Sequence, residues 1–253
     1  MSGLTDRVSN QDLILLAKQQ YEQDKRKTIP SEVVQLITNG QVYPKTHPLR
    51  SGKIEMRYMT AYDEDILTNP SYLREGIVLD KLLEALIVTP VDYATVSKID
   101  KNGLIIAARI LSYGKEYPVI VTDPKTKKQL NRVIDLSKIL PKQFELESDD
   151  NGEFDYALDN GIRLKFRFLS TGDGEDLKIS EFLERSITQI NDTRNLEDIK
   201  NFIRYEFLAR DAKKFRAHVA QNIPDLDMKY EFEGEDGSTF ISGFPIGTDF
   251  FWF

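Results

Sequence analysis

Residues 52–70 read GKIEMRYMTAYDEDILTNP, and within this stretch a strand pattern passes directly into the start of a helix. Ile54, Met56 and Tyr58 alternate with charged residues, which is the two-residue period of a strand with one buried face. Thr60 stands three residues before Asp63, the spacing of a helix capping box. The stretch therefore predicts a strand that runs without a break into the start of a helix.

The three consecutive acids Asp63, Glu64 and Asp65 admit two interpretations. Carboxylates in the first turn of a helix satisfy backbone N–H groups and interact favourably with the helix dipole. A divalent-metal hydrolase could also use them, but it needs further ligands that the sequence does not place. We expect a cap and no metal site, and keep the hydrolase as an alternative.

Composition limits the possible functions. The chain has 253 residues, 40% of them hydrophobic and 30% charged, which is typical of a globular protein with one large or two modest domains. It has no cysteine, so disulfides, thiol nucleophiles and thiolate zinc ligands are excluded. The net charge of −7 argues against general affinity for nucleic acid. The sequence shows neither a signal peptide nor an apolar run of membrane-spanning length, and we expect a cytoplasmic protein whose partners are proteins.

Periodicity and turn residues predict an α+β fold, in which β-hairpins pack with amphipathic helices in two halves of related size. The acidic run ESDDNGEFD at 147–155 is the expected boundary. We therefore predict a helical N-terminal arm at 1–28, an α+β domain at 29–146 and a second α+β domain at 147–253. Helices are expected at 10–27, 79–87, 92–114, 179–191 and 196–221, and hairpins around Asn39-Gly40, 123–129, Asn160-Gly161 and in the last 25 residues.

A basic ladder lies on one face of the strand that follows Asn160-Gly161. Arg163, Lys165 and Arg167 alternate with apolar residues. Such a ladder can contact RNA, and a nucleic-acid-binding adaptor is a second alternative function. In an acidic protein, pairing with neighbouring carboxylates is the more economical interpretation.

The chain ends in four aromatic residues, Phe250-Phe251-Trp252-Phe253. Exposed, they would form an unusual apolar patch, so they either fold onto the core or anchor a partner. We name Phe250, Phe251 and Trp252 as candidate partner-binding residues, with Tyr58 and Tyr62 beside the acidic turn as a second patch. His47 and His218 are the only histidines and have modest local explanations, so we predict no catalytic residues, no cofactor and no enzymatic activity.

Five segments, taken in order, resemble the baseplate hub and tail assembly proteins of contractile-tailed, T-even-like bacteriophages. They are LITNGQVYP at 36–44, MRYMTAYDEDILTNP at 56–70, IRLKFRFLSTGDGEDL at 162–177, LARDAKKFRAHV at 208–219 and the FPIGTDFFWF ending. Similar proteins can carry paired cysteines in zinc-ribbon-like hairpins. Here those positions read TDPKTKKQ at 122–129 and EFEGEDGS at 231–238, so turn hydrogen bonds and packing must hold both hairpins.

The resemblance implies a non-enzymatic hub assembly protein or hub structural subunit, possessing chaperone-like or structural contacts with other baseplate hub and tail proteins. It implies a place in the host cytoplasm during assembly. Retention in the virion baseplate, homo-oligomer formation and the role of residues 1–28 stay open at this point.

Overall fold

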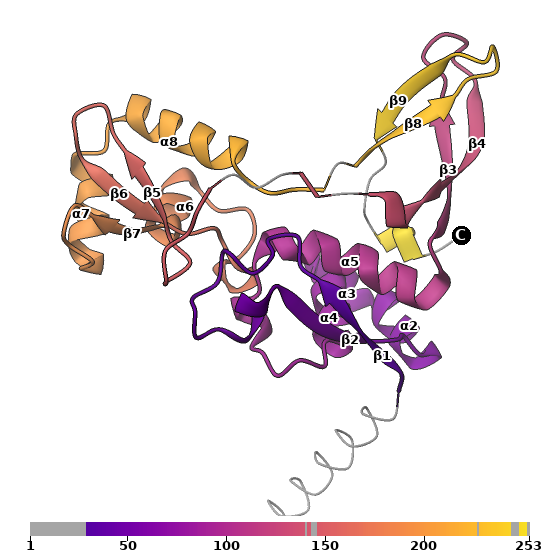
Figure 1. Ribbon diagram of the computed structural model, residues 1–253, viewed down its shortest axis with the longest axis horizontal. Coiled ribbons are helices and arrows are strands. Elements are labelled where there is room, and N and C mark those ends of the chain that lie inside the picture. Colours follow the sequence, from indigo (N-terminus) through magenta and orange to yellow (C-terminus); the bar gives the residue numbers. More distant parts are fainter. Residues whose placement is uncertain (1–28, 140, 143–145, 227, 244–247, 252–253) are drawn as a thin grey trace, which may run out of the picture.

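The computed structural model describes residues 29–139, 141–142, 146–226, 228–243 and 248–251. It shows a mixed α+β protein whose sheets are antiparallel and contain two or three strands. Figure 1 shows three parts: a helical part with the first two strands, a second helical part around β5–β7, and a pair of long hairpins. The predicted helix at 10–27 and the arm at 1–28 lie outside the described residues.

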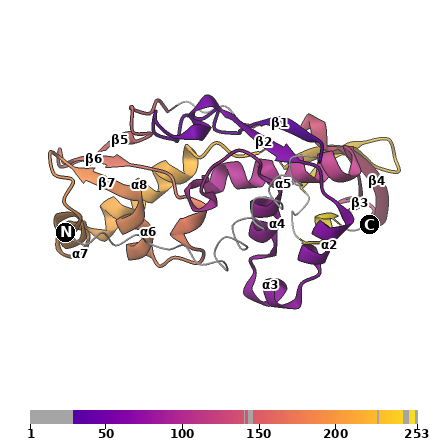
Figure 2. The same ribbon diagram turned by 90° about the horizontal axis from the view of Figure 1, so that it is seen from below.

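The first part, which we call unit 1, spans residues 31–113. Its hairpin pairs β1 (Ser31–Gln35) with β2 (Lys53–Arg57), and Val34 lies opposite Ile54. The helices α2 (Ala61–Leu67), α3 (Pro70–Glu75), α4 (Val78–Leu86) and α5 (Lys98–Tyr113) follow, with the short 3-10 helix η2 (Tyr93–Thr95) before α5. Figure 2 shows the hairpin on one side of α5 and α2–α4 on the other.

The second helical part, unit 2, spans residues 154–221. Its three-stranded sheet has the order β5 (Phe154–Ala157), β6 (Arg163–Phe166), β7 (Ile187–Ile190). The 3-10 helix η4 (Thr171–Asp173) and α6 (Ile179–Ser186) connect β6 to β7. The helices α7 (Leu196–Tyr205) and α8 (Ala209–Gln221) complete it.

Two long hairpins, one from the middle of the chain and one from near its C-terminus, lie side by side (Figure 1). One pairs β3 (Glu116–Thr122) with β4 (Gln129–Asp135), and the other pairs β8 (Lys229–Glu233) with β9 (Thr239–Gly243). Arg132 of β4 donates from Nε and Nη2 to the Glu233 carbonyl, at 3.2 and 2.7 Å. The last hairpin therefore contacts β4, which lies within the range 29–146 predicted for the first domain.

Units 1 and 2 meet through backbone pairing. Ser97, which caps α5, forms an antiparallel bridge with Ser170. The Lys98 N–H donates to the Leu169 carbonyl at 3.0 Å, and the Thr171 N–H donates to the Val96 carbonyl at 2.8 Å. Directional bonds of this kind fix the relative position of two bodies more tightly than apolar packing alone.

The two units share an order of elements. In each, a hairpin leads into a corner, helical segments follow, and the residue after the last of them pairs with the strand before the corner. Ile87 follows α4 and bridges to Met56, while Ile187 follows α6 and pairs with Phe166. A further helix then packs behind the sheet. The two halves are therefore related in architecture as well as in size.

Several predicted element boundaries are wrong. The expected helix 179–191 ends at Ser186, because Ile187–Ile190 pairs with β6, and the expected helix 196–221 breaks between Tyr205 and Ala209. The expected helix 92–114 begins only after Ser97. Asn39-Gly40 forms a turn with positive φ angles of 49° and 81°, but β1 pairs with β2 instead of residues 41–43. The errors at 187–190 and at the partner of β1 have the same cause, because in both places pairing with a strand distant in sequence outweighs the local pattern.

Candidate partner-binding surfaces

The corner after β2 is held by a buried ion pair. Arg57 Nη1 and Nη2 donate to the two carboxylate oxygens of Asp63, at 2.7 and 2.6 Å. The same carboxylate accepts from the Thr60 N–H at 2.8 Å and from its hydroxyl at 2.9 Å. Both charged side chains are almost fully buried. We call residues 57–63 corner 1; it confirms the prediction that Asp63 reaches back to Thr60.

The other two acids of the turn, Glu64 and Asp65, differ in their contacts. Glu64 accepts a hydrogen bond of 2.7 Å from the Tyr113 hydroxyl, which ties α2 to the end of α5, and Asp65 is exposed. Burial acts to raise the pKa of Asp63, but hydrogen bonds from Arg57 and Thr60 outweigh it and lower the pKa. Within the described residues, no group of three or more His, Asp or Glu side chains is arranged to hold a metal ion. These contacts count against the hydrolase alternative.

Unit 2 repeats this corner. Arg167 Nη1 and Nη2 donate to Asp173 at 2.8 Å each, and Asp173 accepts from the Ser170 N–H and hydroxyl at 2.8 and 3.1 Å. The guanidinium also donates to the next carbonyl in both units, that of Tyr58 at 3.0 Å and that of Phe168 at 3.2 Å. We call residues 167–173 corner 2. The shared pattern is an Arg, a Ser or Thr three residues on, and an Asp after three more.

The two candidate tyrosines beside corner 1 differ in exposure. Tyr62 is 82% exposed on the first turn of α2. Tyr58 is half-buried, and its hydroxyl donates to Glu32 of the neighbouring strand. The structure therefore leaves the Tyr62 ring available to a partner and engages the Tyr58 hydroxyl within the hairpin.

The aromatic tail is not an exposed patch where the structure describes it. Phe250 and Phe251 are each 1% exposed. Phe250 packs on Tyr117 of β3 with ring centroids 4.8 Å apart, and its carbonyl accepts from the buried Arg109 Nε at 3.1 Å. Of the two alternatives that the sequence left open, these two rings follow the first in this conformation, because they fold onto the core between α5 and the hairpins. Trp252 lies outside the described residues.

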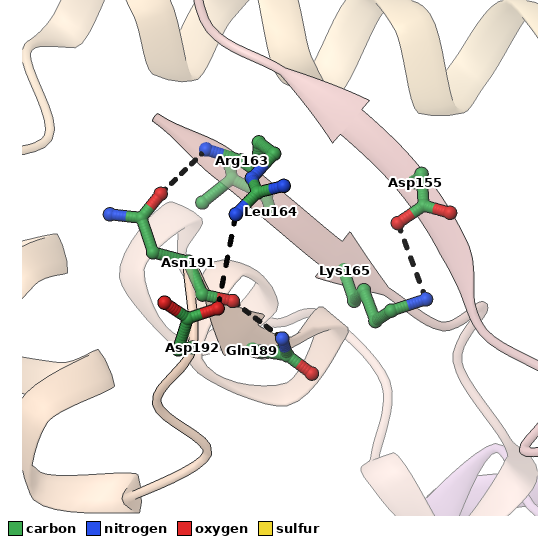
Figure 3. Close-up of a pocket in the computed structure, with 7 residues that line it drawn as sticks. All are labelled: Asp155, Arg163, Leu164, Lys165, Gln189, Asn191 and Asp192. Atoms are coloured by element: carbon green, nitrogen blue, oxygen red, sulfur yellow. Dashed lines mark hydrogen bonds and ion pairs between the residues drawn. The ribbon is translucent and has the colours of Figure 1, made fainter. Parts of the chain in front are cut away.

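The basic ladder is paired with carboxylates. Lys165 Nζ lies 2.8 Å from Asp149 and 3.3 Å from Asp155, and Arg163 Nη2 lies 3.8 Å from Asp192. Figure 3 shows the pairs Lys165–Asp155 and Arg163–Asp192 at a hollow of about 140 Å³. Arg167 belongs to corner 2. The ladder thus follows the pairing interpretation, and its charges are compensated within the chain, which counts against the nucleic-acid alternative.

Both histidines sit against aromatic rings. His47 stacks on Tyr43 with centroids 4.7 Å apart, and its Nε2 lies 2.9 Å from the Thr95 hydroxyl. His218 contacts the rings of Tyr156 and Phe166. Burial lowers the pKa of both imidazoles, which keeps them neutral at pH 7. Their surroundings are those of structural histidines.

Ion pairs join the tip of one long hairpin to the tip of the other. Lys125 pairs with Asp236 at 3.1 Å and Lys128 with Glu235 at 2.8 Å. Within the first turn, Asp123 Oδ1 accepts from the N–H groups of Lys125 and Thr126. These residues do not fit a thiolate zinc site, and turn hydrogen bonds with ion pairs hold the tips together, as the sequence led us to expect.

An exposed apolar surface lies between α6 and α8. Its hollow has a volume of about 400 Å³ and is lined mainly by aliphatic and aromatic side chains, among them Leu177, Ile179, Phe182 and Ile223. Ile179 is 55% exposed. The sequence placed Ile179 and Phe182 in a predicted helix, and it could not show that this helix and α8 leave a hollow.

Sequence reasoning missed the repeated corner. The signal was present, since RYMTAYD at 57–63 and RFLSTGD at 167–173 share the spacing of Arg, Ser/Thr and Asp. Only the geometry shows that the two stretches build the same hydrogen-bond network.

The described part of the chain contains no helix that is both long enough and apolar enough to cross a membrane.

A family model described as T4 bacteriophage base plate protein matches residues 42–239, a range that includes both corners and most of units 1 and 2. No curated protein and no solved structure matches the chain.

Proposed function

The chain belongs to the T4 bacteriophage base plate protein family, and from this premise we propose that it is a non-enzymatic assembly protein or structural subunit of the baseplate hub. Its work is to bind other baseplate proteins and to fix their relative positions. The single observation that carries the proposal is the family match, which covers well over half of the chain.

The use of the ionisable side chains supports a binding role. Asp63, Asp173 and Glu64 each bond a partner within the fold, and the charges of the basic ladder are compensated by carboxylates. Groups engaged in this way stabilise the architecture and are not free to transfer protons or bind phosphate. Surfaces for partners come from exposed groups such as Tyr62 and from the hollow between α6 and α8.

Rigid connection of the two units suits this role. A protein that positions others works best when its own surfaces keep a fixed separation, because each degree of freedom lost on binding weakens the complex. The backbone bonds between 96–98 and 169–171, together with the donation from Lys45 N–H to the Asp150 carbonyl at 2.8 Å, supply such a connection.

The test is recovery of partners from infected cells. A phage lacking the chain is complemented with an affinity-tagged copy, and tail intermediates are isolated and identified by mass spectrometry. We expect hub and baseplate proteins to co-purify with the tagged chain and not with the tag alone. Normal baseplates assembled without the chain, or a tagged chain that stays monomeric throughout infection, would remove the proposal. Asp65→Asn is expected to complement fully, which a metal hydrolase built on these acids would not allow.

A further inference from the structure

Matching helices of the two units differ in how well their apolar faces are covered. Ile87 after α4 and Ile187 after α6 pair with the strands before their corners, so positions counted back from these two residues correspond. Five positions earlier stand Leu82 on α4 and Phe182 on α6. Leu82 is fully buried, whereas Phe182 is half-buried and lines the hollow between α6 and α8, which we call the α6–α8 hollow.

The contrast continues one turn earlier, and a difference in chain length accompanies it. Leu79 of α4 is half-buried, but its counterpart Ile179 of α6 is 55% exposed. Sixteen positions separate Asp63 of corner 1 from Leu79, and only six separate Asp173 of corner 2 from Ile179. The extra residues of unit 1 complete α2 and form α3, and both helices pack against α4. Unit 2 lacks such a segment, which leaves the face of α6 open among the described residues.

The helix α2 shows what kind of segment can close such a face. Leu67 at its end is 1% exposed, and α2 packs against α4. Glu64, one turn before Leu67, accepts a hydrogen bond of 2.7 Å from the Tyr113 hydroxyl on α5. Residues three positions apart are neighbours on the surface of a helix. A short helix that carries an apolar side chain and a carboxylate one turn apart therefore connects the two longer helices of unit 1.

The long helix of unit 2 offers a cation to such a carboxylate. It packs behind the sheet through Phe215, whose ring contacts those of Tyr156 and Phe166. The next residue, Arg216, is half-buried and lines the α6–α8 hollow. Its Nε donates to the Ala212 carbonyl at 3.4 Å, and among the described residues no carboxylate lies within 4.0 Å of its guanidinium.

The other charged groups of the hollow determine on which side an acid can bind. Lys98 is already paired with Glu175, at 3.0 Å between Nζ and Oε2. Asp176 lines the hollow just before α6 and carries a negative charge. A carboxylate on a bound segment is therefore favoured on the α8 side, beside Arg216, and disfavoured near Asp176.

We propose that the α6–α8 hollow binds a short acidic amphipathic helix of a neighbouring baseplate protein, in the place that corresponds to that of α2 in unit 1. The apolar side chains of this helix cover Ile179 and Phe182, and a carboxylate one turn away pairs with Arg216. An apolar groove commonly takes the apolar face of a helix, and complementary charges set the register. The inference rests on the proposed function and deepens it by naming one binding surface and the chemistry of the segment it takes.

Two aspartate variants provide a matched test. Ile179 and Leu196 are exposed aliphatic residues, at 55% and 57%, and each is the first residue of a helix. A carboxylate in the first turn of a helix is favourable, so both variants should fold. Ile179→Asp places a charge in the α6–α8 hollow, and Leu196→Asp makes a closely similar change outside it.

The probe is a peptide with the sequence of residues 60–76, TAYDEDILTNPSYLREG, acetylated and amidated at its ends and added to the full ¹⁵N-labelled chain. It contains both helices that unit 2 lacks. We expect saturable amide shift changes at Phe182 and Ala220 in the wild type and in Leu196→Asp. We expect at least about tenfold weaker binding in Ile179→Asp, because its carboxylate would lose water without gaining a partner. A peptide of scrambled sequence should leave these signals unmoved.

Charge exchange tests the role of Arg216. Arg216→Glu is expected to weaken binding of the peptide about fivefold, and a peptide with Glu64→Lys should regain affinity for this variant but not for the wild type. Arg210→Glu is the control, since Arg210 lies on the same helix outside the hollow and its side chain is 78% exposed. If Arg216→Glu and Arg210→Glu affect the two peptides equally, the pairing with Arg216 is wrong.

Three further results would overturn the inference. The first is the absence of saturable change at Phe182 and Ala220 with millimolar peptide. The second is a full chain that dimerises and becomes monomeric with Ile179→Asp, which would show that the hollow takes a second copy. The third is peptide binding that appears only after Leu16→Asp, which would show that residues 1–28 of the same chain cover the hollow.

The complementation experiment separates this inference from the proposed function. Tagged Ile179→Asp is expected to lose at least one of the baseplate proteins that tagged Leu196→Asp recovers from infected cells. Identical sets of proteins from the two variants would overturn the docking site and leave the proposed function standing. Failure of the proposed function has a different result, since the tagged wild type itself would then recover no baseplate protein.

Discussion

Arg57 and Asp63 form a two-pronged ion pair whose side chains are only 6% and 5% exposed, and Arg167 and Asp173 form its counterpart in unit 2 with the arginine 34% exposed. The pair does more than compensate charge. It fixes the corner at which a strand turns into a helix, because the carboxylate also binds the backbone and hydroxyl of Thr60. Burial makes the pair costly to break, since the remaining charge has lost its water without gaining a partner.

Asp63→Asn is therefore expected to destabilise the protein strongly. Asparagine keeps an acceptor for Thr60 but leaves the Arg57 guanidinium buried without a counter-charge, at a cost of about 3–5 kcal/mol in the free energy of unfolding. Asp173→Asn should cost less, because Arg167 can be hydrated. Urea unfolding measures both, with Asp65→Asn as the exposed control. A change for Asp63→Asn no larger than that control would show that the pair does not hold the corner.

The same carboxylate predicts a pH dependence. Because its folded pKa is lowered, Asp63 contributes stability that is fully present above the pKa of the unfolded chain. That contribution is lost as the pH falls from there through the folded pKa. The difference in stability between wild type and Asp63→Asn should therefore be largest at neutral pH and shrink below about pH 4. Thermal unfolding from pH 7 to pH 3 tests this, and a difference that is constant with pH would contradict it.

The sequence predicted correctly those features that depend on contacts between residues close together in the chain. The strand, corner and helix around Thr60 and the Asn160-Gly161 hairpin follow from alternation, capping and turn residues that lie within a few positions of one another. The pairing of the basic ladder with carboxylates followed from charge balance. Each of these features depends on contacts that are close in sequence or on composition.

The features that the sequence did not predict depend on contacts with residues far away in the chain. Ile179, Phe182, Leu183, Ile187 and Ile190 have helical spacing, yet the last two lie in a strand because β6 offers them a free edge. For Phe250 the sequence left open a place in the core or a role as partner anchor, and its burial involves Tyr117 and Arg109, which stand far earlier in the chain. The hydrophobic pattern of a segment shows that it needs cover, not which element covers it.

Phe250→Ala is expected to lower stability by about 3–5 kcal/mol, because it opens a cavity beneath the hairpins. Phe250 is 1% exposed, whereas Tyr62 is 82% exposed. Tyr62→Ala should therefore change the free energy of unfolding by less than about 0.5 kcal/mol. Guanidinium unfolding of the two variants gives the comparison. Equal small effects would mean that the tail is not part of the core.

A buried carboxylate organises the start of unit 1. Asp100 accepts from the Thr38 N–H and hydroxyl at 3.0 and 2.8 Å and from the Tyr43 hydroxyl at 2.7 Å, while that hydroxyl accepts from the Ser97 N–H at 3.0 Å. Tyr43→Phe removes two of these bonds and leaves a buried donor unpaired, so we expect a loss of about 1–3 kcal/mol. Tyr156→Phe is the control at a tyrosine that is only partly buried. Equal unfolding midpoints for both variants would contradict this account.

Gly172→Ala tests the junction between the units. Its added methyl would meet the Ala94 carbonyl oxygen at 2.8 Å, so the corner must move away from residues 93–98. We expect a loss of about 1–3 kcal/mol and faster amide hydrogen exchange at Thr171 and Lys98, whose N–H groups bridge the junction. Exchange within β5 and β6 should keep its relative protection, because the sheet of unit 2 does not depend on that contact. Gly243→Ala serves as the control, since the nearest atom to its methyl among the described residues would be the Met228 carbonyl oxygen at 3.6 Å. Unchanged exchange at Lys98 would show that corner 2 is not held by the close approach at Gly172.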